Sequence, residues 1–167
     1  MTTLPASDYF IAPMRVLDMP AINFFYVANQ PTAQSNLDRD LDLLLDSLYQ
    51  AKAQANLAQV GPDIVRYYKV ESGEPDLTCM EVGIAVKTNT LPAGAAQVKV
   101  LPAYRCAAVL LWGGLGHITD AYNILMQSMK EAGLAHPGDT REIHYAFETP
   151  SSPNNLMGIY MGIVGSQ

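Results

Sequence analysis

The chain has 167 residues, of which 49% are hydrophobic and 16% charged, and its formal net charge at pH 7 is -6. This length can bury a core without a disulfide or a metal, so we expect a single domain over residues 1–167. High hydrophobicity with few charges excludes an intrinsically disordered chain. The ten Lys and Arg residues are spread along the sequence, which argues against direct nucleic-acid binding. An acidic surface is explained by solubility alone, and the alternative is that it favours a cationic partner.

The two cysteines, Cys79 and Cys106, each lie in an apolar run with strand character. This placement is typical of small buried hydrophobic residues in a reducing compartment. The sequence contains no CxxC motif and no Cys/His cluster, so we expect neither a metal site nor a cofactor. Its apolar runs are too short to cross a bilayer, and its first residues lack the pattern of a secretory signal. These features predict a cytoplasmic protein with no membrane partner.

Two stretches of the sequence resemble each other. An apolar segment runs into Pro-Ala at Val16 to Ala21 and again at Val98 to Ala103, and the two prolines lie 82 residues apart. After each comes a longer strand-like run, a turn, a helical pattern and two more strand-like runs. Self-similarity of this kind indicates an internal repeat.

The repeat sets the expected organisation of the chain. Repeat one covers about residues 11–86, a connection with Pro and Gly covers 87–96, and repeat two covers about 97–164. The predicted fold is α+β, with two pseudo-symmetric strand-helix-strand-strand repeats that form an antiparallel sheet carrying two helices. The two halves must meet at a seam.

Each repeat contains one amphipathic helix. The first is predicted over residues 36–57, with leucines at helical spacing and acidic residues in its first turns, where the helix dipole favours negative charge. The second is predicted over residues 119–132, and Gly133 supplies its C-terminal stop. Tyr122 lies on the apolar stripe of this second helix, which core packing explains.

Alternation sorts the closing strand of each repeat into two faces. In the first, one face is apolar and the other carries Cys79, Glu81, Gly83 and Ala85. In the second, the corresponding face carries Gly158, Tyr160, Gly162 and Val164. Small residues here leave a concavity or allow a close approach to the backbone. A bulge or a tight corner explains them equally well.

A further strand is predicted over residues 141–148, and it carries the main candidate for a functional residue. Glu142 shares a face with His144, while Tyr145 lies on the opposite face unless the strand is bulged. One interpretation of Glu142 is a solvent-facing carboxylate. The other is a carboxylate on the floor of an aromatic pocket, where it attracts a lipophilic cation. The nine tyrosines and Trp112 supply rings for cation–π contacts.

The order of these motifs resembles the GyrI-like, or Rob-type, effector-binding domain of AraC-type and MerR-type regulators. From Val98 onward the chain runs through Leu-Pro-Ala-Tyr-Arg, Trp-Gly-Gly, Ala-Tyr on a helix, Arg-Glu-Ile and a closing strand, and Met80 to Gly83 looks like the closing strand of the first half. The resemblance implies a stand-alone module with a barrel-like or saddle-shaped sheet, two helices and a central cleft that binds lipophilic, often cationic, molecules.

The resemblance also implies a set of ligand-binding residues. The pocket glutamate of the family falls on Glu142, and the acidic position of its first closing strand falls on Glu81. By position, Trp112, Tyr68 and Tyr145 are expected to line the pocket, together with Tyr160 on the small-residue face of the last strand. No catalytic residue and no metal ligand is expected.

Three functions stay open at this point. The first is a small-molecule binding module for lipophilic cations, with a link to drug sensing or transcription regulation. The second is a hydrolase of reactive strained-ring compounds, in which a pocket Glu acts as a general base. Against an enzyme, the sequence has no visible Ser/His/Asp or Cys/His constellation, and its three histidines are poorly placed. The third is a protein–protein regulator, such as a gyrase inhibitor, whose protein partner the sequence does not identify.

Overall fold

The computed structural model describes residues 8–57, 61–69, 77–136 and 138–164. Within these residues the chain forms two α-helices and a ten-stranded sheet in which all the strand pairs are antiparallel. The fold is therefore α+β, as the sequence predicts. In the described residues no helix is long and apolar enough to cross a membrane.

The elements of the first half precede the connection over 87–96. In chain order they are β1 (Tyr9–Ile11), β2 (Arg15–Met19), β3 (Ile22–Ala28), β4 (Thr32–Ala33), the 3-10 helix η1 (Gln34–Asn36), α1 (Leu37–Gln54), β5 (Asp63–Lys69) and β6 (Leu77–Val86). The helix predicted over 36–57 is confirmed, and it ends near Asn56, whose φ of 52° is incompatible with a continuing right-handed helix.

The second half repeats this order of elements. It consists of β7 (Gln97–Leu101), β8 (Tyr104–Gly113), the 3-10 helix η2 (Leu115–His117), α2 (Ile118–Glu131), β9 (Thr140–Ala146) and β10 (Leu156–Gly162). The predicted second helix is confirmed to within one residue at each end. Thus β3–α1–β5–β6 corresponds to β8–α2–β9–β10.

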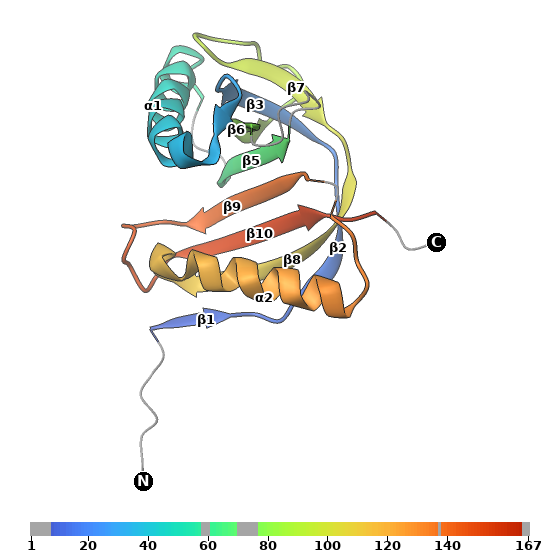
Figure 1. Ribbon diagram of the computed structural model, residues 1–167. Helices are drawn as coiled ribbons and strands as arrows, with labels where there is room; N and C mark the ends of the chain where they lie inside the picture. The colour runs from blue at the N-terminus through green and yellow to red at the C-terminus, as the bar shows by residue number, and fades with distance from the viewer. Residues whose placement is uncertain (1–7, 58–60, 70–76, 137, 165–167) are drawn as a thin grey trace.

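One continuous sheet joins the two halves. Its strand order is β1-β8-β10-β9-β5-β6-β3-β7, with β2 also paired to β8 and β4 to β6. The two halves exchange edge strands, since β1 and β2 pair with β8 and β7 pairs with β3, and the helix-bearing parts of the sheet meet where β5 pairs with β9. At this seam Val65 lies opposite Glu142. Figure 1 shows β9 crossing the space between α1, beside the upper half of the sheet, and α2, in front of the lower half.

The register across this seam defines two faces of the sheet. Val65, Glu142 and Ile159 are neighbours on three adjacent strands and point to the same side. Val65 packs in the cluster under α1 and Ile159 in the cluster under α2, so both helices cover this side, which we call the helix face. The opposite side, the bare face, carries a third apolar cluster that includes Ile64, Ile143 and Tyr160.

On the small-residue faces of β6 and β10, neighbouring groups approach Gly83 and Gly158 closely, whereas Ala85 lines a cavity. A Cβ on Gly83 would lie 2.2 Å from the carbonyl oxygen of Phe25, and a Cβ on Gly158 would lie 2.4 Å from the Tyr160 ring. Of the alternatives that the sequence leaves open, these two positions show close approach to the backbone. The glycines of the closing strands therefore serve packing on the bare face.

Candidate functional site

Glu142 lies at the centre of the helix face and belongs to neither apolar cluster there. It is 6% exposed. Its strand neighbours on that face are Val65, packed under α1, and Ile159, packed under α2. The carboxylate is therefore buried at the boundary between the two halves of the molecule, where each half contributes one helix.

Two tyrosines, one from each half, hydrogen-bond to this carboxylate. The Tyr122 hydroxyl on α2 donates to Oε1 at 2.5 Å, and the Tyr67 hydroxyl on β5 donates to Oε2 at 3.5 Å. Burial raises the pKa of Glu142, and the two hydroxyl donors oppose that rise only in part. Burial and the nearby carboxylate also raise the pKa of both tyrosines, so the hydroxyls stay protonated as donors.

No permanent cation neutralises Glu142 among the described residues. The basic group within ion-pair range is His144, whose Nε2 lies 4.0 Å from Oε2. Burial lowers the pKa of His144, against the opposing charge of Asp63, so its ring is neutral near pH 7. An ionised carboxylate with no cation is costly in a buried setting, and this is the chemical feature that distinguishes the site.

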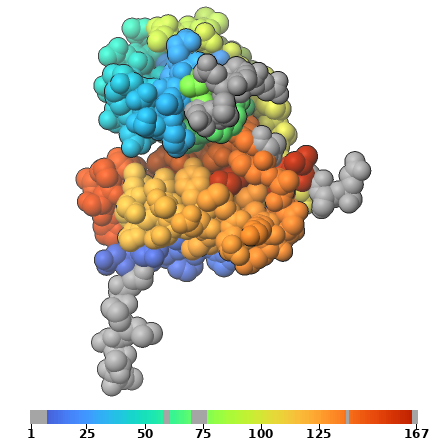
Figure 2. All heavy atoms as spheres, viewed as in Figure 1, coloured from blue at the N-terminus to red at the C-terminus, as the bar shows by residue number. Residues whose placement is uncertain are grey.

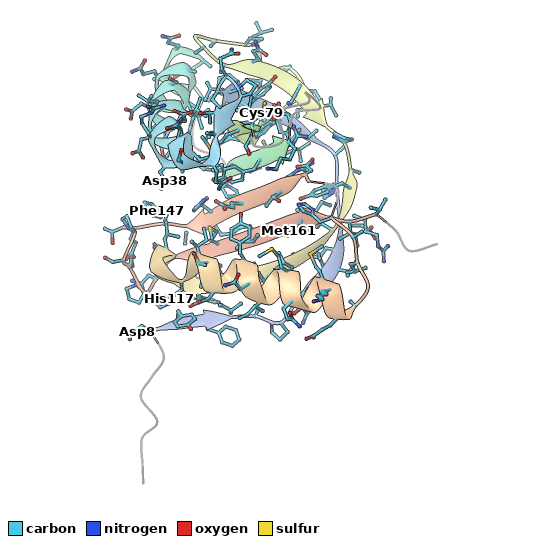
Figure 3. The ribbon with its side chains drawn as sticks, in the orientation of Figure 1. Asp8, Asp38, Cys79, His117, Phe147 and Met161 are labelled. Atoms are coloured by element: carbon cyan, nitrogen blue, oxygen red, sulfur yellow. The ribbon has the colours of Figure 1, made fainter. Side chains whose placement is uncertain are left out.

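The surroundings of Glu142 are acidic and aromatic. Asp38, in the first turn of α1, contributes to the raised pKa of Tyr67 through its charge. The ring of Phe147 is 53% exposed and packs edge-on against His144, with their centroids 6.4 Å apart. Figure 3 shows Asp38 and Phe147 at the same end of the space between the two helices. These groups favour a ligand that is both positively charged and apolar.

The surface is indented where the two halves meet. Figure 2 shows this groove between the cyan atoms of α1 and the yellow atoms of α2, with orange atoms of β9 set back between them. Glu142 lines neither the cavity beside the start of α1 nor the cavity on the bare face. In this conformation the Tyr122 hydroxyl occupies the hydrogen-bonding position on its carboxylate.

Glu81 lies on the opposite face of the sheet, where cations surround it. It is 2% exposed. Arg66 Nη1 lies 3.0 Å from its Oε2, Lys99 Nζ lies 2.5 Å from its Oε1, and the Tyr68 hydroxyl donates to Oε1 at 3.2 Å. The phase of β6 explains this placement, because Met80 and Val82 face α1 and Glu81 must face the other way. Its charge is fully compensated within the protein.

The aromatic residues expected around Glu142 lie on the bare face with Glu81. The Tyr68 ring is covered by the Arg66 guanidinium at 4.4 Å. The Tyr145 and Tyr160 hydroxyls share a short hydrogen bond, and Trp112 is 54% exposed and pairs with Phe10 on β1. The structure therefore does not bring these four side chains, or Glu81, together with Glu142.

Strand and helix periodicity explains both the misplaced residues and the missed ones. Tyr67 precedes Tyr68 in β5, so it points to the helix face when Tyr68 points away from it. The apolar stripe of α2 predicts core packing for Tyr122, and its ring does pack against the cluster under α2, but the stripe gives no sign that its hydroxyl bonds to Glu142. The feature that places Tyr67 on the helix face is the alternation of β5. Val65 packs under α1, and Tyr67, two residues further along the strand, points to the same side.

The described residues contain no group of three or more His, Cys, Asp and Glu side chains that could hold a metal ion. Both cysteines are free thiols, Cys79 half-buried and Cys106 buried. The chemistry that the site offers is therefore that of a buried carboxylate and its tyrosine donors.

Comparisons with known proteins place the fold. No family model and no curated protein sequence matches the chain, but solved structures do. The C-terminal domain of EcmrR is similar with a TM-score of 0.67 and 16% identity over 95% of this chain and 99% of that chain. In EcmrR bound to DNA, the match has a TM-score of 0.67 and 18% identity over 93% of this chain. This chain spans only 57% of the EcmrR chain in that complex.

Two further structures are similar over nearly the whole chain. SAV2435 bound to tetraphenylphosphonium has a TM-score of 0.67 and 8% identity over 92% of this chain and 95% of that one. A hydrolase from Listeria innocua has a TM-score of 0.54 and 11% identity over 91% of this chain and 92% of that one. The chain thus has the GyrI-like effector-binding fold.

Proposed function

We propose that this protein binds lipophilic cations in the groove between α1 and α2, with Glu142 as the counter-charge. The observation that carries the proposal is a carboxylate that is 6% exposed, lies between the two halves and has no cationic partner among the described residues. The likeness in fold to SAV2435, which was solved with tetraphenylphosphonium, supports this choice of ligand.

The energetics favour an organic cation over a hydrated one. Keeping an ionised carboxylate out of water costs free energy that a paired cation offsets. An organic cation with a diffuse charge has a small desolvation cost of its own, and the rings of Tyr67, Tyr122 and Phe147 can contact it through their faces. The charge-assisted contribution of Glu142 should be about 1.5–3 kcal/mol.

Binding requires Tyr122 to move. Its hydroxyl now donates to Oε1 of Glu142 at 2.5 Å, which is the position that a ligand cation approaches. Rotation of the Tyr122 side chain would expose the carboxylate and present the ring to the ligand. Rotamer changes of this kind are common when a ligand enters a binding site.

The test uses ligands of the same shape and opposite charge. Calorimetric titration with tetraphenylphosphonium should show binding, whereas tetraphenylborate, which has the same shape and a negative charge, should not bind. Glu142→Gln should weaken tetraphenylphosphonium binding by about tenfold to a hundredfold. Glu131→Gln, which removes one negative charge from the exposed end of α2, is the matched control and should bind as the wild type does. Equal affinity of wild type and Glu142→Gln would contradict the proposal.

A second candidate function is hydrolysis of a strained-ring electrophile. It is favoured by the raised pKa of Glu142, which suits a general base that takes a proton from an attacking water. The likeness in fold to a hydrolase adds support. Incubation with a small epoxide, followed by chromatography for the diol, tests it. Turnover that Glu142→Gln abolishes and Glu131→Gln retains would decide for the enzyme, and an unchanged epoxide would decide against it.

A further inference from the structure

A second cavity lies on the bare face, behind the strand that carries Glu142. Its volume is about 140 Å³, and its walls come from β5, β9, the β2–β3 connection and the end of β6. Most of the lining side chains are apolar, and those used in the argument are Ile64, Ala85, Arg141, Ile143 and Tyr145. Arg141 supplies the guanidinium among them, because it precedes Glu142 and points to the opposite face.

The guanidinium of Arg141 is buried without a full set of partners. Arg141 is 4% exposed, and its Nε has no hydrogen-bond partner in the part of the chain that the structure describes. The nearest carboxylate oxygen, on Asp139, lies 3.8 Å from Nε, which is beyond hydrogen-bond distance. The Tyr104 ring lies 3.8 Å from the guanidinium carbon, but a ring face does not satisfy an in-plane N–H donor.

Among the described residues, the charged groups around Arg141 include one more cation than carboxylates. Asp139 is engaged by Arg66, whose Nη2 and Nε both lie 3.1 Å from its carboxylate oxygens. Glu81 is engaged by Arg66 and Lys99. Within the part of the chain that the structure describes, three cations (Arg66, Lys99 and Arg141) thus face two carboxylates. A buried guanidinium in this position favours an external anion.

We propose that this cavity binds a small carboxylate with an apolar body, such as an aromatic monocarboxylate, and that Arg141 is its counter-charge. An apolar cavity of about 150 Å³ accommodates a benzene-sized molecule, so the volume here suits a body of that size. The planar guanidinium matches a carboxylate in shape and charge. This site lies on the opposite face of the sheet from Glu142, and its occupant has the opposite charge.

The test compares benzoate with benzamide, which has the same ring and no charge. Titration of the wild type with benzoate, followed by the Arg141 Nε–Hε signal in ¹H–¹⁵N NMR spectra, should shift that signal, whereas benzamide should not. Ala85→Leu fills the cavity from an exposed position and leaves Arg141 in place. Both Ala85→Leu and Arg141→Gln should weaken benzoate binding by about tenfold or more.

Glu142→Gln separates this proposal from the function proposed for the groove. It should leave benzoate binding within about twofold of the wild type, because the Glu142 side chain points to the helix face, bonds there to Tyr67 and Tyr122, and shares none of these contacts with Arg141. Ala85→Leu should in turn leave tetraphenylphosphonium binding unchanged. Benzoate binding that persists in Ala85→Leu, that benzamide matches, or that never occurs in the wild type would overturn the proposal, whatever the result at Glu142.

Discussion

Glu81 and Glu142 are both buried on central strands, but their partners differ completely. Glu81 is 2% exposed and contacts Arg66, Lys99 and the Tyr68 hydroxyl. Glu142 is 6% exposed and, among the described residues, accepts its hydrogen bonds from two tyrosines. One carboxylate is part of an internal ion-pair network, and the other has tyrosine hydroxyls and no permanent cation beside it among the described residues. Burial of a carboxylate therefore does not by itself identify a binding site, and our proposal for Glu142 rests on its burial without a permanent cation among the described residues.

The positions of the two residues explain the difference. Glu81 lies on the bare face, where Arg66 comes from the adjacent strand β5 and Lys99 reaches it from β7. Glu142 lies on the helix face, where its neighbours are tyrosines on β5 and α2 and His144, whose pKa is lowered by burial. The helix face is thus the side of the sheet on which a ligand can supply the missing charge.

The largest expected effect is a loss of stability in Glu81→Gln. Removing this charge leaves Arg66 and Lys99 without their shared partner, and breaking such a buried ion pair costs about 3 kcal/mol. Urea unfolding monitored by circular dichroism would measure the loss, and Glu131→Gln should unfold as the wild type does. A change below about 0.5 kcal/mol, the size typical of surface substitutions, would show that the network does not contribute as we describe.

The second-largest expected effect is a fall in cation affinity at low pH, caused by protonation of Glu142. The pKa of this carboxyl is raised by burial, so the group becomes protonated at a higher pH than an ordinary glutamate. Affinity for tetraphenylphosphonium should fall by up to about tenfold per pH unit once the pH is below that raised pKa. Calorimetric titrations between pH 4 and pH 8 would record the fall. A flat profile in the wild type would mean that the ionised carboxylate plays no part.

A smaller effect of opposite sign is expected for the stability of Glu142→Gln. The pKa of Glu142 is higher in the folded protein than in the unfolded chain, so the folded protein binds this proton more tightly. The contribution of Glu142 to the stability of the wild type therefore declines as the pH rises from about 4.3, the pKa of an unperturbed Glu, through the raised pKa. At pH 7 the glutamine variant should be more stable by about 1 kcal/mol, or about 2–4 °C in Tm. At pH 4 the gain should disappear. Thermal melts at both values test this, and a destabilised variant at pH 7 would give Glu142 the same structural role as Glu81.

The smallest expected effects concern the two tyrosine donors. Tyr122→Phe should raise the pKa of Glu142 further than Tyr67→Phe, because the Tyr122 hydrogen bond is the shorter and opposes the burial effect more strongly. The cost in stability should be about 1 kcal/mol for Tyr122→Phe and less for Tyr67→Phe. A ¹³C NMR titration of the Glu142 carboxyl carbon would rank them. A larger rise of the Glu142 pKa in Tyr67→Phe than in Tyr122→Phe would mean that Tyr67 on β5 is the stronger hydrogen-bond donor to Glu142.

Sequence patterns predict the fold well and the composition of the site only in part. The two helices, the repeated element order and the core face of β6 follow from periodicity, which local sequence carries directly. The position of Glu142 between two helices follows only once the strand order is known, since β5 and β9 are separated by more than 70 residues. An error of one residue in the predicted alternation of β5 selects Tyr68 instead of Tyr67. Tyr68 lies on the bare face, whereas the tyrosine that bonds to Glu142 lies on the helix face.

The seam between β5 and β9 also determines how the groove can respond to ligands of different sizes. Asp63 to Tyr67 pair with Thr140 to His144 along the whole of that seam, so the halves cannot swing apart without breaking backbone hydrogen bonds beside Glu142 itself. The floor of the groove is therefore rigid. Under the function that we propose, selectivity for ligand size comes from rotation of side chains such as Tyr122 on the walls, and ligands of different bulk should leave the backbone spacing across the seam unchanged.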